Sequence, residues 1–231
     1  MRFTFDDLVA VMAHLRSEDG CPWDREQTHA TLAPYLLEET HETLDAIARD
    51  DPSALTAELG DVLLQVVFHA QIAREAGRFD SGAVVDGLVH KLLDRHPHVF
   101  GELRLSTAEE VLAHWDEIKR REAPDRAPAD GIPKTLPALS RAQKLLRRSR
   151  SDGSSGGGTA ADALRGIREK LDAAGARLPH DGKAAASPEL EGAIGDLLLA
   201  VVALADAGGV DAEAALRRAC EGLAERHGAP R

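Results

Sequence analysis

The chain has 231 residues, of which 43% are hydrophobic and only 3% aromatic, and its formal net charge is −11. This length allows one large domain or two small ones, and the negative charge argues against non-specific binding to nucleic acid or to an anionic membrane. The two cysteines form no disulfide framework, and there is neither a signal peptide nor a long apolar run, so we expect a cytoplasmic protein.

The first half of the chain has apolar residues at helical spacing nearly throughout. Strand-like alternation of useful length is absent from the sequence. We therefore predict an all-α fold, most simply a four-helix bundle with extra helices. The fourth predicted helix ends before Pro97, because proline stops a helix. The expected helices cover about residues 8–15, 36–47, 59–72, 84–95 and 107–121.

The texture changes after residue 122, where prolines and then a Ser/Gly-rich run interrupt the helical pattern. Such a composition is typical of a flexible linker. One short helix is expected within it, over about residues 136–150. Helical texture then resumes and continues to the end of the chain, with a break around residues 179–188. The predicted organisation is a helical domain at 1–122, a linker with one short helix at 123–159, and a second helical domain at 160–231.

The second helical domain reads as a degenerate copy of the first. Residues 58–67 align with 193–202, and 94–96 align with 225–227, at nearly the same separation in both halves. This pattern indicates an internal duplication. The copy keeps Asp196 in place of Asp61 but has lost the other polar residues of the segment. Ala193, Ala200 and Leu204 stand where the first copy has Glu58, Gln65 and His69.

Two acidic clusters stand out in the first half, Glu38-Glu39-Thr40-His41-Glu42 and Glu58-Leu59-Gly60-Asp61. Glu38, Glu39 and Glu42 are three or four residues apart, so they can converge on one side of a helix. An alternative interpretation is a solvated acidic surface, opposite an apolar stripe that we place at Leu36, Thr40, Leu44 and Ile47. For this cluster alone, that alternative is the stronger one.

The second cluster favours an internal site over a solvated acidic surface. Glu58, Asp61, Gln65 and His69 fall on one line of a helix that is otherwise apolar nearly all round, and such a helix is normally buried. Buried carboxylates without a counter-charge are costly, so the line must face an internal site. The acidic turn at 50–52 makes the two helices an antiparallel hairpin, across which the carboxylates meet.

Several carboxylates without cysteine suit a hard cation, Mg²⁺ or Mn²⁺. A di-iron carboxylate site is the rival interpretation, since Glu38 and His41 have the Glu-x-x-His spacing. The second Glu-x-x-His is missing, however, because Asp61 stands where histidine is required.

Three further residues are candidates for holding an anionic or aromatic ligand. Lys91 and Arg95, four residues apart near a helix end, are placed to bind phosphates, or are solvated cations at a helix terminus. Trp23, in a loop before the acidic helix, is placed to stack on a base, or closes the end of the bundle.

The chain resembles the MazG-type nucleoside triphosphate pyrophosphohydrolases. The family motif is Glu-Glu-x-x-Glu followed, after a gap, by Glu-x-x-Asp, which matches the two acidic clusters. The flanking residues also agree, and the resemblance covers residues 1 to about 120. These flanks are Gly20-Cys21-Pro22-Trp23-Asp24, Gln27-Thr28, Asp45-Ala46-Ile47, Gln65-Val66-Val67, Gly77-Arg78-Phe79 and Arg95-His96-Pro97-His98-Val99-Phe100.

The resemblance implies an all-α bundle that forms a homodimer, depends on Mg²⁺, and converts nucleoside triphosphates to the monophosphate and pyrophosphate. By motif, the metal ligands would be Glu39, Glu42, Glu58 and Asp61. Glu38, the candidate catalytic residue, would lie outside the metal ligands or help activate the attacking water. Lys91 and Arg95 would contact the phosphates.

The alternative function is a non-catalytic dimer that binds nucleotide or metal as a regulator, against which the intact motif argues. The departures from the family lie in the second half. Arg168 and Ala193 stand where glutamates would be expected, so the second copy is expected to serve packing, dimer formation or regulation.

Overall fold

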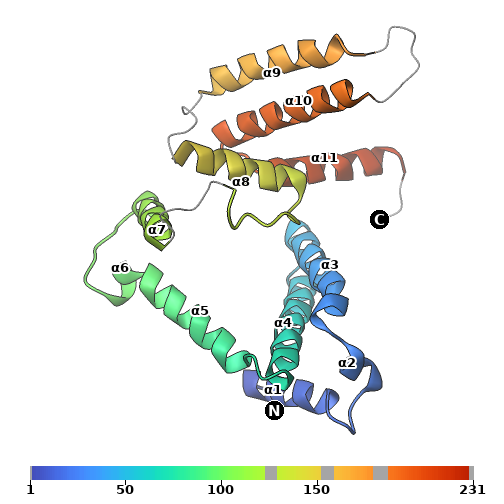
Figure 1. The fold of residues 1–231 in the computed structure, drawn as a ribbon, viewed down its shortest axis with the longest axis vertical. Coiled ribbons are helices and arrows are strands. Elements are labelled where there is room, and N and C mark those ends of the chain that lie inside the picture. The colour runs from blue at the N-terminus through green and yellow to red at the C-terminus, as the bar shows by residue number, and fades with distance from the viewer. Residues whose placement is uncertain (1, 123–128, 152–158, 179–186, 229–231) are drawn as a thin grey trace. The chain divides into compact units, whose positions relative to one another are not determined.

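The computed structural model describes residues 2–122, 129–151, 159–178 and 187–228 (Figure 1). Within these residues all regular structure is helical, which confirms the all-α prediction. The chain divides into two compact units, Met1–Arg121 and Glu122–Arg231. Most of the expected Ser/Gly linker, at 152–158, and most of the expected break near 179–188 lie outside the described residues.

The first unit contains the five helices predicted from periodicity and two short ones. The predicted helices are mostly longer than expected, because capping residues extend them beyond their apolar stretches. The helices are α1 (Phe5–Leu15), α2 (Pro22–Glu26), α3 (His29–Ala48), α4 (Pro52–Glu75), α5 (Ser81–Arg95), α6 (Pro97–Phe100) and α7 (Ala108–Glu122).

The predicted turn between the two acidic helices is confirmed. Asp50 adopts a left-handed conformation with φ of 52°, which reverses the chain after α3. The Asp51 side chain then accepts hydrogen bonds from the backbone amides of Ser53 and Ala54, at 3.0 and 3.1 Å, and so caps α4. Pro52 occupies the first turn of α4, where its missing amide costs nothing. Helices α3 and α4 consequently pack as an antiparallel hairpin.

The core of the first unit lies where α1, α3 and α4 meet. Met12, Leu32, Val67 and Phe68 are buried there and pack together. On α3 the buried residues are Leu32 and Ala46, so the sequence stripe expected at Leu36, Thr40, Leu44 and Ile47 is not the packed face; Leu44 and Ile47 are exposed.

An arginine ties the loop after α1 to α4. The Arg16 guanidinium donates hydrogen bonds to the Glu75 carboxylate at 2.7 to 3.1 Å and lies over the Phe68 ring, 5.5 Å from its centre. It also donates to the backbone carbonyls of Asp24 and Gln27. Because this side chain is only 7% exposed, it fixes the α2 segment against a rigid part of the unit.

Apolar side chains remain exposed on the first half of α4 and along α5. Leu59, Leu63 and Val66 of α4 are exposed, so the expectation that this helix is buried all round is wrong for a single chain. Figure 1 shows the reason, since α5 diverges from α4 after the turn that joins them. The exposed apolar residues of α5 are Val84, Val85, Leu88, Val89, Leu92 and Leu93.

The second unit contains a second helical hairpin. Its helices are α8 (Ala138–Ser151), α9 (Ala160–Gly175), α10 (Pro188–Ala207) and α11 (Ala212–Arg226). Helices α9 and α10 pack along each other, and α8, from the range expected as a linker, packs against α10 and α11.

A buried amide joins these last elements. The Gln143 side chain donates to the Val210 carbonyl at 2.7 Å and accepts from the Ala212 amide at 3.1 Å. It also donates to Asp206, whose side chain is 1% exposed and is paired with Arg147 and Arg150. Because both ends of the amide are satisfied, the network fixes α8 to the α10–α11 turn.

No single helix in the described part of the chain is long and apolar enough to cross a membrane. The pair α10 and α11 passes the same test of length and composition only when the two are taken together, and they are bent by 107°.

Candidate active site

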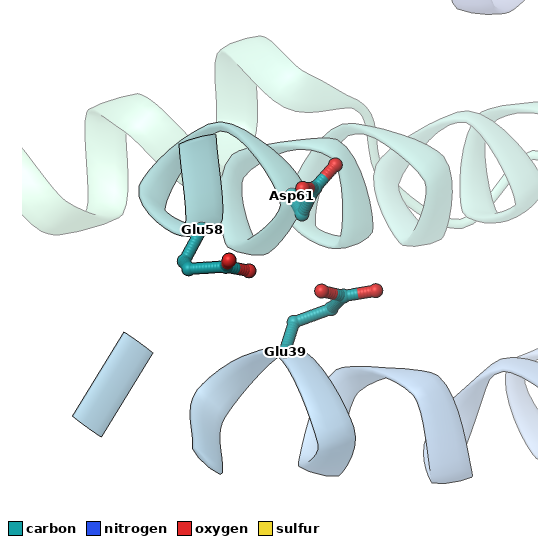
Figure 2. A group of neighbouring side chains, drawn as sticks. All are labelled: Glu39, Glu58 and Asp61. Carbon is teal, nitrogen blue, oxygen red and sulfur yellow. The ribbon is translucent and has the colours of Figure 1, made fainter. Parts of the chain in front are cut away.

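Three carboxylates meet across the α3–α4 hairpin. Figure 2 shows Glu39 extending from α3 towards Glu58 and Asp61 on α4, and one oxygen of each lies within 4.8 Å of the others. The packed face of α3 carries Glu39 into this position, since Leu32, Glu39 and Ala46 recur every seven residues, close to two helical turns. The hairpin fold itself therefore assembles the cluster.

The carboxylates of this cluster repel one another. Burial raises the pKa of the Glu39 carboxyl, and the negative charges of Asp61, Glu42, Glu58 and Glu38 raise it further. Such a shift means that the charged form is disfavoured in the folded protein. A divalent cation that accepts oxygen ligands would relieve this repulsion, so the donor set fits Mg²⁺ or Mn²⁺.

The other two glutamates of the first cluster lie further out. On α3, Glu38 directly precedes Glu39 and Glu42 follows it by one turn. Both side chains are exposed. Glu42 is outside the group of three whose oxygens converge, although its charge still acts on Glu39. The structure thus brings together three of the four metal ligands expected from the motif.

The polar line of α4 faces α3, as predicted. Gln65, one turn after Asp61, is 5% exposed, and its Oε1 has no hydrogen-bond partner among the described residues. His69, one turn further, contacts His29 of α3, with 2.8 Å between the two Nδ1 atoms. Their rings are stacked, with centroids 5.1 Å apart and an angle of 14° between planes. This contact closes the far end of the hairpin.

The histidine pair makes the hairpin sensitive to acid. Burial, and then the charge of His29, lowers the pKa of His69 below the ordinary 6.5. The unfolded chain therefore binds more protons than the folded one as the pH falls below about 6.5, and stability is lost in that range. We expect thermal denaturation between pH 7.5 and 5 to show a smaller loss for His69→Leu than for the wild type.

His14→Gln, which removes an exposed histidine from α1, is the matched control and should behave like the wild type. The contribution of Glu39, which has the opposite sign, is common to all three proteins and cancels in the comparison. Parallel pH profiles for His69→Leu and the wild type would contradict the assignment.

The candidate phosphate contacts lie on a different helix from the carboxylates. Lys91 is exposed on α5, and Arg95 is half-buried at the end of this helix. The backbone carbonyl of Arg95 accepts a hydrogen bond from the Trp115 indole at 2.8 Å, which joins α5 to α7. Trp23 lies in α2, and its ring meets the Tyr35 ring edge to face.

In the second unit, a lysine lies beside the one carboxylate that corresponds to the cluster of the first unit. Asp196 of α10, the counterpart of Asp61 in the sequence alignment, pairs with Lys170 of α9 at 2.8 Å. The other polar positions of the α4 line are alanine or leucine here, as the sequence showed. The pair supplies the remaining carboxylate with a counter-charge from within the chain.

Sequence reasoning missed three of these residues. His29 was detectable, because it lies about as far before the turn at 50–52 as His69 lies after it. Tyr35 was detectable as the residue one turn before Glu39. Lys170 carried no signal, since a lysine on a charged helix is usually solvated.

Comparison with known proteins matches the segment that contains these carboxylates to one family. Residues 27–100, which include both acidic clusters, match the family model described as the MazG nucleotide pyrophosphohydrolase domain. The chain is 44% identical over 227 residues to the nucleoside triphosphate pyrophosphohydrolase of Escherichia coli, covering 96% of this chain and 84% of that protein.

Two further relatives match this chain over different lengths. The protein named nucleoside triphosphate pyrophosphohydrolase/pyrophosphatase MazG from Thermotoga maritima is 42% identical over 224 residues, covering 96% of this chain and 83% of that protein. The nucleoside triphosphate pyrophosphohydrolase of Mycobacterium tuberculosis is 43% identical over 149 residues, covering 64% of this chain and 45% of that protein.

Proposed function

We propose that this chain, which belongs to the MazG nucleotide pyrophosphohydrolase family, hydrolyses nucleoside triphosphates between the α- and β-phosphates, giving the monophosphate and pyrophosphate. The observation that carries the proposal is the convergence of Glu39, Glu58 and Asp61 across the hairpin. A polyphosphate cannot approach these carboxylates without a cation, so the substrate and the metal ion would bind together.

Mg²⁺ is the proposed cofactor, with Mn²⁺ as a possible substitute. Glu39, Glu58 and Asp61 would hold it, and Glu42, one turn from Glu39 on α3, would complete the ligand set expected from the motif. When bound, the cation supplies neutralisation of the phosphate charges and makes a water molecule more acidic. The raised pKa of Glu39 supports this role, because burial and the neighbouring negative charges disfavour its charged form and a cation would offset both.

The protein's own groups would complete the reaction. Glu38, exposed beside the cluster, is proposed to accept the proton of the water that attacks the α-phosphorus. Lys91 and Arg95 are proposed to offset the charge of the departing pyrophosphate. Their position on α5, which diverges from the hairpin, means that α5 must be ordered against another surface for them to act (Figure 1).

A homodimer would supply this surface. The exposed apolar side chains of α5 and of the first half of α4 make these helices poor candidates for permanent exposure to water. A second copy of the chain is the proposed partner, as in the family that the sequence resembles. The second unit is proposed to be a duplicated domain without a metal site, in which Lys170 provides the charge that a cation provides in the first.

The test is to incubate the protein with each nucleoside triphosphate and Mg²⁺ and to assay pyrophosphate and orthophosphate separately. We expect stoichiometric monophosphate and pyrophosphate, and no activity with EDTA. In ¹⁸O-labelled water the label should enter the monophosphate if the α-phosphorus is attacked. Release of orthophosphate and a diphosphate would refute the proposed bond. Release of neither product, with nucleotide still bound, would favour a regulatory binding role.

A further inference from the structure

Two aromatic side chains are exposed side by side in the first unit. Trp23 is 50% exposed and Tyr35 is 40% exposed, and their ring centroids are 6.1 Å apart with 78° between the planes. The chain has one tyrosine and two tryptophans in 231 residues. In an edge-to-face pair, the ring that presents its edge keeps both of its own faces uncovered by its partner, and the partner keeps one.

This pair adjoins the carboxylate cluster. Tyr35 lies on α3 one turn before Glu39, and Glu38 and Glu42 follow it at three and seven residues. The four residues therefore share one flank of the helix. Four residues of helix correspond to a rise of about 6 Å. A ligand whose phosphates lie at Glu39 can extend along this flank and bring a second group to the aromatic rings.

The position of Trp23 is fixed by hydrogen bonds. Its backbone carbonyl accepts from the Gln27 side chain at 2.9 Å, and the Gln27 Oε1 accepts from the Thr31 hydroxyl at 2.8 Å in the first turn of α3. The buried Arg16 holds the carbonyls of Asp24 and Gln27 from the other side. The backbone that carries Trp23 is therefore held in place before any ligand binds, which limits the conformational entropy lost on stacking.

We propose that Tyr35, together with Trp23, forms the platform on which the base of the nucleotide stacks. This inference rests on the proposed function and adds the subsite for the base, with Tyr35 as a substrate-binding residue. Aromatic faces attract flat π-systems and offer nothing to a phosphate, which separates this end of the site from the carboxylates. Because every base has a π-face, the platform provides affinity without selecting one base.

The experiment compares a ligand that carries a base with one that has only phosphates. Binding of an α,β-methylene analogue of ATP and of inorganic tripolyphosphate, each with Mg²⁺, is measured by calorimetry for four proteins. These are the wild type, Tyr35→Leu, Tyr35→Phe and Leu37→Ala, the last a control that truncates an exposed residue on another side of α3. We expect Tyr35→Leu to weaken the analogue about tenfold, within the range for base stacking, and to leave tripolyphosphate unchanged. Tyr35→Phe and Leu37→Ala should bind both ligands like the wild type.

Three results would overturn the platform. Unchanged binding of the analogue to Tyr35→Leu would remove Tyr35 from the subsite, and equal weakening of both ligands would place it at the phosphates. A weaker dimer with unchanged nucleotide affinity would assign the pair to the contact between copies. Since the analogue is not hydrolysed, these outcomes are read from binding alone. A failure of the proposed reaction would show separately, as absence of pyrophosphate release.

Discussion

The Glu58→Ala variant is expected to lose at least about 1,000-fold in kcat for nucleoside triphosphate hydrolysis while keeping its helical fold. The glutamate shares the cluster with Glu39 and Asp61, and the loss of one proposed ligand would weaken both the binding of Mg²⁺ and its placement. Metal ions contribute several kcal/mol of charge stabilisation in such reactions, and about 1.36 kcal/mol corresponds to one factor of ten. Steady-state pyrophosphate release at saturating substrate and Mg²⁺ measures the loss.

Glu109→Gln is the control, because it removes an exposed glutamate from α7 in the same unit. It should retain the wild-type rate. Circular dichroism and size-exclusion chromatography establish that Glu58→Ala is folded and in the same oligomeric state. A Glu58→Ala variant that turns over at close to the wild-type rate would show that the cluster is not the catalytic centre.

The second prediction concerns stability with and without metal. Glu39 has a raised pKa, so its charged form costs folding free energy at every pH above the ordinary value of 4.5, and this cost disappears as the pH falls or as a cation binds. Because the Glu39 carboxyl is partly exposed and solvent screens its repulsion, Glu39→Gln should raise Tm in EDTA at pH 7.5 only slightly, by less than about 2 °C. It should also abolish most of the Tm increase that Mg²⁺ gives the wild type.

Asp45→Asn tests whether the location of the charge matters. It removes one exposed negative charge from the same helix, outside the group of converging oxygens. We expect little change in Tm in EDTA and a normal response to Mg²⁺. If Asp45→Asn stabilises as much as Glu39→Gln, general surface repulsion would explain both, and the inference of a metal site from the pKa would fail.

Much of the fold was readable from the sequence, because the signals were local. Helical spacing located α1, α3, α4, α5 and α7, and the acidic turn correctly indicated the hairpin. The polar line on α4 was correctly expected to face inwards. A helix that is apolar on its other sides is normally packed against neighbours, so its glutamine and histidine face the protein interior. These are consequences of backbone geometry and solvation within one or two helices.

The predictions that were wrong concerned which helix faces pack against each other. The stripe of larger side chains on α3 was expected to be its packed face, but Leu44 and Ile47 are exposed and the small Ala46 is buried, which lets α4 come close. The burial of α4 was overestimated, because a sequence does not say whether an apolar surface is covered by the same chain or by another. The sequence places Tyr35 one turn before Glu39, but the contact between its ring and that of Trp23 depends on the fold.

The ion pair between Lys170 and Asp196 bears on how the two halves respond to their surroundings. As an exposed pair it adds little to stability, about 1 kcal/mol or less. A covalently attached ammonium cannot be diluted or chelated, however, whereas a bound ion exchanges with the solution. The α9–α10 hairpin therefore has the same charge balance in a cell starved of magnesium as in one replete with it. If the α3–α4 hairpin binds a cation as proposed, its stability would follow ion availability by mass action, whereas the charge pairing of the α9–α10 hairpin would not.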